Sequence, residues 1–129
     1  IVPKKFGRRS TKDLYSNYLG LYNAREFCTE RGMWAIVDME WTKDLARYIS
    51  GRKCLEVMAG AGWLAKALSD HGVDIIATDN ASWTKVHTKM KHVFTVRTME
   101  ALEAIEKYRD RDILIVSWPP YLTDISPLL

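Results

Sequence analysis

The sequence predicts an α/β fold, in which helices flank a parallel β-sheet. After Gly51, short apolar segments alternate with amphipathic ones, the pattern of strands connected by helices. The run 113–116 is apolar at every position, as expected for a parallel strand buried on both faces. A glycine pair, Gly60 and Gly62, follows the first apolar segment and suits a tight turn from strand to helix. The 129 residues suffice for one core, so we expect a single globular unit.

The region before this alternation predicts an N-terminal helical extension. Two groups of apolar residues recur at helical spacing, namely Leu14, Tyr15, Tyr18, Leu19 and Tyr22, and then Trp41, Leu45, Tyr48 and Ile49. Gly51 is expected to end the second helix. Residues 1–50 therefore read as a basic tail with helices, and residues 51–129 as the α/β part of the same unit.

Within residues 51–129, four strands and three helices are expected. The predicted strands are 54–57, 74–77, 93–96 and 112–116. The predicted helices are 62–70, 83–90 and 99–108. Leu102 and Ile105 should face inward from the last helix. Because strands and helices alternate, the crossovers should be right-handed and ligands should bind at the carboxyl ends of the strands.

Composition limits the classes of protein that are possible. The net charge of +3 comes from the first 12 residues, which hold five basic groups and no acid, and the rest has 14 basic against 16 acidic residues. Such a tail could hold nucleic-acid phosphates, but the sequence favours a solvated, partly disordered leader. No secretory signal or long apolar run is present, which favours a cytoplasmic protein. Cys28, Cys54 and the three histidines show no metal-ligand spacing, so no metal site is expected.

The turn after the first strand is the first candidate binding site. Gly60 and Gly62 let a ligand approach the backbone, and amides at a helix start can donate to an anionic group. A turn without a ligand remains possible, as does a dinucleotide site, because 60–65 fits Gly-x-Gly-x-x-Ala and Asp79 lies 19 positions after Gly60. Two residues argue against a dinucleotide site. Glu56 lies inside the strand, four residues before the first glycine, and the bulky Trp63 stands where a pyrophosphate would need room.

These residues resemble a known family. The strand Leu55-Glu56-Val57 leading into Ala59-Gly60-Ala61-Gly62 is similar to the first motif of class I S-adenosylmethionine-dependent methyltransferases, which have a Rossmann-like fold. The resemblance implies that Glu56 fixes the loop and the methionine ammonium of the cofactor. It also implies that Ala59, Gly60 and Gly62 receive the methionine portion.

Two further motifs follow the second and third strands. The resemblance places the ribose-binding acid at Asp79, next to Asn80, which could contact the adenine edge. It places recognition of the adenine amino group near Glu100, with Met99 against the ring. The alternatives are a helix cap at Asp79, a turn residue at Asn80 and a first-turn acid at Glu100.

The fourth motif, Ser117-Trp118-Pro119-Pro120-Tyr121, follows the last strand. It resembles the (Asp/Asn/Ser)-Pro-Pro-(Tyr/Phe/Trp) motif of methyltransferases that modify amino groups, including those of nucleic-acid bases. There a polar side chain and the first proline's carbonyl accept from the target amino group, and the ring stacks on it. We therefore expect Ser117, Pro119 and Tyr121 to serve the methyl acceptor. Trp118 stands at the polar position, so Ser117 would have to turn inward.

The resemblance thus implies methyl transfer from S-adenosylmethionine to an amino nitrogen, with a nucleic-acid base as one possible acceptor. The alternatives are a non-catalytic subunit or sensor that binds this cofactor, and an NAD-dependent oxidoreductase. The family's strand order would be third, second, first, fourth, with the fourth strand at an exposed edge. We therefore expect the C-terminal half to be incomplete, and either a longer polypeptide or a second chain, such as another copy in a homo-oligomer, to cover this edge.

Overall fold

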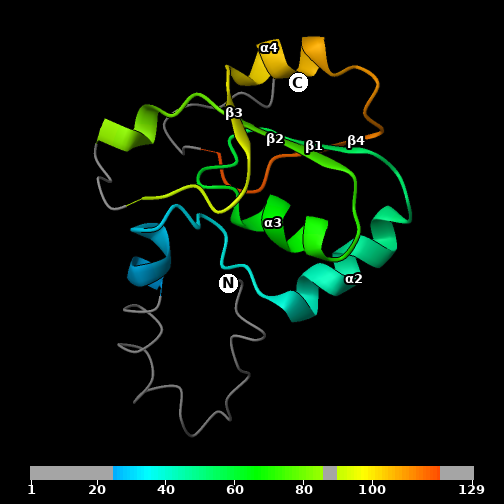
Figure 1. The fold of residues 1–129 in the computed structure, drawn as a ribbon, viewed down its shortest axis with the longest axis horizontal. Helices are drawn as coiled ribbons and strands as arrows, with labels where there is room; N and C mark the ends of the chain where they lie inside the picture. The colour runs from blue at the N-terminus through cyan, green and yellow to red at the C-terminus, as the bar shows by residue number, and fades with distance from the viewer. Residues whose placement is uncertain (1–24, 86–89, 120–129) are drawn as a thin grey trace, which may run out of the picture.

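The sheet has four parallel strands, and their order across the sheet (third, second, first and fourth along the chain) is the one that the family resemblance implies. A computed structural model describes residues 25–85 and 90–119 of the chain (Figure 1). The strands are β1 (Cys54–Glu56), β2 (Ile75–Asp79), β3 (Val96–Thr98) and β4 (Ile113–Ile115). The helices are α2 (Met39–Ile49), α3 (Trp63–Asp70), α4 (Ala101–Lys107) and the short 3₁₀ helix η2 (Ser82–Lys85). The α/β architecture with a Rossmann-like sheet is confirmed.

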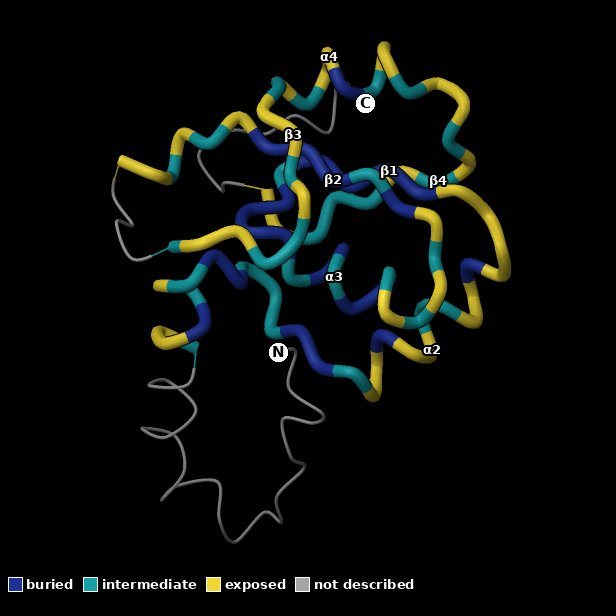
Figure 2. The backbone as a smooth tube through the Cα atoms, in the orientation of Figure 1, coloured by how far each residue is buried: buried dark blue, intermediate teal, exposed yellow. Residues whose placement is uncertain are grey.

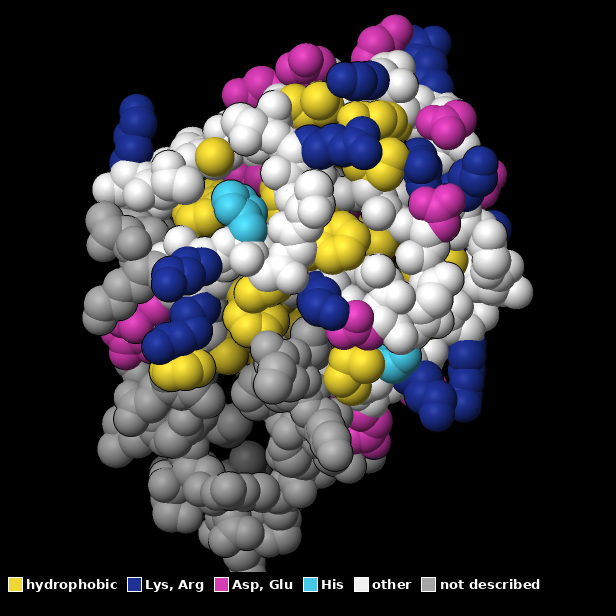
Figure 3. Space-filling view, viewed as in Figure 1, with side chains coloured by type: hydrophobic (Ala, Val, Ile, Leu, Met, Phe, Trp, Pro, Cys, Tyr) yellow, Lys and Arg dark blue, Asp and Glu magenta, His cyan; other side chains and the backbone are white. Residues whose placement is uncertain are grey.

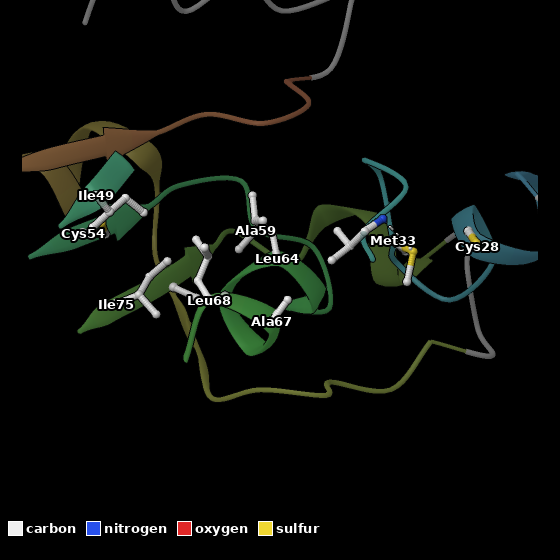
Figure 4. Close-up of a cluster of buried hydrophobic side chains, with 12 residues drawn as sticks. Cys28, Met33, Ile49, Cys54, Ala59, Leu64, Ala67, Leu68 and Ile75 are labelled. Carbon is white, nitrogen blue, oxygen red and sulfur yellow. Dashed lines mark hydrogen bonds between the residues drawn. The ribbon is translucent and has the colours of Figure 1, made fainter. Parts of the chain in front are cut away.

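Helices cover the two faces of the sheet unequally. In Figure 1, α2 and α3 lie on one side of the strands and α4 lies on the other. The larger core lies on the α2 and α3 side and includes Leu64, Leu68 and Ile75, which Figure 4 shows together. The smaller core under α4 contains only three buried residues, Leu55, Val57 and Ala104. The sheet is therefore anchored mainly through α3.

Capping residues mark both ends of helix α2. The Asp38 carboxylate accepts hydrogen bonds from the amides of Glu40 (2.9 Å) and Trp41 (3.1 Å), so it caps the N-terminus. Ser50 takes the left-handed conformation at the C-cap, and Gly51 follows with a φ of 77°. The helix expected around Trp41 is confirmed, and its last residue, Ile49, lies two positions before Gly51.

Burial falls from the centre of the sheet to its edges, as Figure 2 shows. All three residues of β1 are buried, whereas β3 and β4 are only partly so. Leu114, in the middle of β4, is 40% exposed, so the prediction that this strand is buried on both faces is wrong. The reason is that β4 is an edge strand and α4, the helix on that face, is only seven residues long.

Three other predictions need correction. The third strand is Val96–Thr98 instead of 93–96, because Ala77 of β2 pairs with Val96 while the Val93 amide donates to the Ala61 carbonyl. Leu102 was expected to face inward but is 46% exposed, whereas Ile105 does pack on the core. Where the helix over 83–90 was expected to begin, the structure has the 3₁₀ helix η2, and residues 86–89 lie outside the described residues.

Some sequence predictions fall outside the described residues. The helix expected around Leu14 to Tyr22 and the basic tail of residues 1–12 lie there. Within 25–85 and 90–119, no helix has the length and apolar character needed to cross a membrane. Cys28 and Cys54 are both buried and free, and burial raises the pKa of each thiol.

Candidate functional site

The predicted site residues follow the carboxyl ends of all four strands. Glu56 ends β1 and leads into the glycine turn, residues 58–62. Asp79 ends β2, Glu100 follows β3, and Ser117 follows β4. Hydrogen bonds join these ends in pairs, so the four motifs form one continuous row along this edge of the sheet.

The amides of the glycine turn already have acceptors within the protein. Gly60 donates to the Asp79 carboxylate over 2.8 Å, Gly62 donates to the Ala59 carbonyl over 3.0 Å, and Ala61 donates to the Gly32 carbonyl over 3.3 Å. The expectation that amides of this turn are free for an anionic group is therefore not met at these three positions. Instead, the turn is fixed in shape by its own neighbours.

Asp79 holds two loops together. Its side chain is buried, and besides Gly60 it accepts from the Ala81 amide (2.7 Å) and from the Trp83 indole nitrogen (2.8 Å). A carboxylate offers about four acceptor positions, so three donors leave about one for a ligand. The Ala81 bond and the following η2 also fit the capping role that the sequence left open.

The second and third motifs meet through one side-chain contact. The Asn80 amide nitrogen donates to Glu100, at 3.2 Å from Oε1 and 3.4 Å from Oε2. Glu100 occupies the N-cap position of α4 but forms no side-chain cap there. Both residues are exposed, so this pair lies at the surface between the ends of β2 and β3.

Glu56 is the least satisfied carboxyl group of the site. It is only 1% exposed, its Oε1 accepts a 3.4 Å hydrogen bond from the Ser117 hydroxyl, and its Oε2 has no donor among the described residues. Burial raises the pKa of Glu56 to about 8, while the Ser117 hydroxyl acts in the opposite direction. Ser117 therefore does turn inward, toward the buried carboxyl.

A small pocket opens beside Glu56. Its walls are Glu56, Ala59, Trp63, Leu64 and Ser117 from the α/β part, and Gly32, Met33, Trp34, Ala35 and Val37 from the segment before α2. We call residues 31–37 the strap. No motif in the sequence indicated that the strap forms a pocket wall. The one local hint is a glycine followed by two bulky apolar residues, Gly32, Met33 and Trp34, all of which line the pocket.

An aromatic row borders the same edge of the sheet. Trp34 and Trp83 meet edge to face with ring centroids 6.1 Å apart, and Trp83 and His92 do so at 5.7 Å. The hydrogen bond to Asp79 fixes the orientation of the central ring, Trp83. No sequence pattern links these three residues, because they come from three separate segments of the chain.

The fourth motif is only partly within the described residues. Trp118 is 50% exposed, and the Arg25 guanidinium lies 4.4 Å from the centre of its ring. Pro119 is exposed, and Tyr121 lies outside the described residues. Trp118 thus faces solvent next to the inward-turned Ser117.

Charge and metal ligands add little to the site. Basic and acidic side chains are interspersed on the face drawn in Figure 3, without a region of one sign. In the described ranges, no three His, Cys, Asp or Glu residues gather as metal ligands. No family model, curated protein or solved structure matches the chain.

Proposed function

We propose that this protein binds S-adenosylmethionine at the carboxyl ends of its strands and transfers the methyl group to an amino nitrogen. The observation that carries the proposal is the contiguity of the four motifs. Gly60 contacts Asp79, Asn80 contacts Glu100, and Ser117 contacts Glu56. Residues from four separate segments thus meet in the strand order β3-β2-β1-β4 that the resemblance implies.

The Glu56 pocket fits the ammonium end of such a cofactor. Among residues 25–85 and 90–119, no group donates to the buried Glu56 Oε2, and leaving a buried polar atom unpaired costs free energy unless a ligand supplies the partner. An ammonium group supplies that donor, and its charge favours the ionised carboxyl although burial raises the pKa of Glu56 to about 8. Binding of an ammonium ligand should therefore release protons near neutral pH.

The ribose end of the cofactor fits less fully. Asp79 keeps about one acceptor position beyond its three internal donors, so it suits one ribose hydroxyl better than two. Asn80 and Glu100 lie next along the edge and suit the adenine. S-adenosylmethionine itself supplies an electrophilic methyl group, and the role of these residues is to bind and align it.

The acceptor side rests on Ser117 and its neighbours. The Ser117 hydroxyl donates to Glu56, so its oxygen keeps lone pairs that can accept from an amino group. The exposed face of Trp118 offers a surface for a planar acceptor such as a nucleic-acid base. Trp118 at the polar position of the motif also supports the second candidate, a subunit or sensor that binds the cofactor without catalysis.

Calorimetry with S-adenosylmethionine, S-adenosylhomocysteine and NAD tests the proposal. We expect both sulfur compounds to bind and NAD not to bind. Glu56→Gln should weaken binding at least tenfold because the ammonium loses a charged partner, an effect of about 1.5–3 kcal/mol. Asp44→Asn, which alters an exposed helix residue, serves as the matched control.

The outcomes separate the candidates. Binding of NAD alone would reject the proposal in favour of an oxidoreductase. Cofactor binding without methyl transfer to any amino-bearing nucleoside, oligonucleotide or peptide would leave the non-catalytic subunit. An unchanged affinity in Glu56→Gln would remove Glu56 from the cofactor site.

A further inference from the structure

Two hydrogen bonds tie the strap to the glycine turn and to the start of α3. The Ala61 amide donates to the Gly32 carbonyl over 3.3 Å, and the Trp63 indole nitrogen donates to the Arg31 carbonyl over 2.9 Å. Ala61 lies within the turn and Trp63 is the first residue of α3. The strap therefore contacts the turn at the position where an anionic ligand group would approach.

The strap and the turn also approach more closely than side chains would allow. A Cβ atom on Gly60 would lie 2.4 Å from Trp34 Nε1 and 2.7 Å from the Gly32 carbonyl oxygen. A Cβ atom on Gly32 would lie 2.6 Å from the Ala61 Cβ. Two glycines on opposite sides of the contact, both with positive φ, thus permit this backbone approach.

With the strap in this position the pocket is small. Its empty volume is about 200 Å³ even with the solvent at its mouth included, whereas sites for drug-sized ligands have roughly 300–1,000 Å³. Glu56, at the base of the pocket, is 1% exposed. A ligand the size of a nucleoside therefore does not fit into the pocket beside Glu56 while the strap stays in place.

We propose that the strap is an autoinhibitory element: the Gly32 carbonyl occupies the Ala61 amide, and the anionic group of the ligand must displace it. The proposal rests on the proposed function, since it concerns the same turn. At 3.3 Å, the Ala61 bond is at the long end of the range for amide hydrogen bonds, so a carboxylate can replace it with a shorter, charge-assisted one. If the strap competes with the ligand, loosening the strap should raise the affinity for the ligand. If the strap instead covers bound ligand, loosening it should lower that affinity.

Hydrogen exchange of the full chain without ligand tests whether the strap leaves the turn. Trp63→Phe keeps a smaller aromatic side chain but removes the indole donor to the Arg31 carbonyl, so exchange of the Ala61 amide should quicken about fivefold. Gly32→Ala, which places a Cβ against Ala61, should quicken it further. The Val57 amide, bonded to Ile115 in the sheet, should not change. Tyr108→Phe is the control, since it removes one hydrogen-bonding group from an aromatic residue on α4's side of the sheet.

Titration with S-adenosylhomocysteine then gives the sign of the effect. Competition predicts that Trp63→Phe binds more tightly, by up to about fivefold, because a larger fraction of the protein has the strap open. Weaker binding would make the strap a cover and overturn the proposal, as would unchanged Ala61 exchange in both folded strap variants. Absence of binding in every variant would refute the proposed function instead, while the exchange rates would still decide whether the strap opens.

Discussion

Glu56 and Asp79 end neighbouring strands in the middle of the sheet, and both carboxyl groups are buried, yet their surroundings differ. Asp79 accepts from three donors, the Gly60 and Ala81 amides and the Trp83 indole. Glu56 accepts from a single side chain, the Ser117 hydroxyl, and the Ala65 amide also lowers its pKa, while its Oε2 has no hydrogen-bond partner among the described residues. The pKa of Glu56 is raised to about 8 by burial.

The difference separates a structural carboxylate from one suited to a ligand. Three hydrogen bonds fix the Asp79 carboxylate and the loops around it. The buried oxygen of Glu56 lowers stability in the absence of a partner, and such groups gather at functional sites. In the predictions below, substitutions at or beside each carboxyl group test this contrast, starting with the largest effect.

Asp79→Ala should destabilise the protein by about 4 kcal/mol or more, because three donors lose a charged acceptor and each such bond contributes roughly 1.5–3 kcal/mol. Urea denaturation at pH 7 measures the free energy of unfolding. Asp44→Ala, at an exposed ion pair with Arg47, should change it by less than about 0.5 kcal/mol. A similarly small effect of Asp79→Ala would contradict its structural role. Weaker cofactor binding is expected as well.

Glu56→Gln should remove a pH dependence of stability. The folded pKa of Glu56 is about 8, above the ordinary 4.5, so the folded chain holds the proton more tightly than the unfolded chain. Its contribution to stability is therefore complete below pH 4.5 and is lost as the pH rises through 8. From pH 6 to 8 the parent should lose about 2 kcal/mol relative to Glu56→Gln, because the slope of about 1.4 kcal/mol per pH unit flattens as the pH approaches the folded pKa.

Denaturation curves of both proteins at several pH values between 5 and 9 measure this difference. The curves should diverge as the pH rises, with Glu56→Gln the more stable at the alkaline end. Parallel profiles over the whole range would mean that Glu56 ionises normally in the folded protein.

Much of the fold could be predicted from the sequence because it depends on patterns within short segments. Apolar runs located β1 and β2, and the helical spacing around Trp41 located α2. Errors occurred at the edges of the sheet, where tertiary contacts decide. The register of β3 follows from its pairing with β2, and the exposure of Leu114 follows from the short α4.

The candidate site was predictable in position but not in its interactions. Strand ends indicated Glu56 and Asp79, because ligands bind there in parallel sheets. The hydrogen bond from Gly60 to Asp79 spans 19 positions, and the strap contacts Ala61 from 29 positions away. Contacts between residues so far apart in the chain leave no local sequence pattern. It could therefore not be predicted that acceptors within the protein already bind the amides of the turn.

Gly60→Ala should destabilise the protein by about 2 kcal/mol and Gly72→Ala by about 1 kcal/mol, since a left-handed conformation costs roughly 1–2 kcal/mol in residues with a Cβ. Both glycines have positive φ, but a Cβ at Gly72 meets nothing within 4 Å, whereas one at Gly60 meets Trp34 and Gly32. The difference between the two variants in urea denaturation isolates the contact with the strap. Equal losses of unfolding free energy in the two variants would show that the strap moves away from the added Cβ without destabilising the protein.

The smallest expected effect concerns the one hydrogen bond that Glu56 receives from a side chain. Ser117→Ala removes a 3.4 Å bond at the long end of the usual range, so stability at pH 5 should change by less than about 1 kcal/mol. The Ser117 hydroxyl lowers the pKa of Glu56, and its loss should therefore raise that pKa further. The alkaline loss of stability should accordingly extend to higher pH in Ser117→Ala than in the parent. The double variant with Glu56→Gln should show no such shift, because its side chain does not titrate. A midpoint that stays in place or moves to lower pH would mean that Ser117 does not act on Glu56, and the link between the first and fourth motifs would then be steric alone.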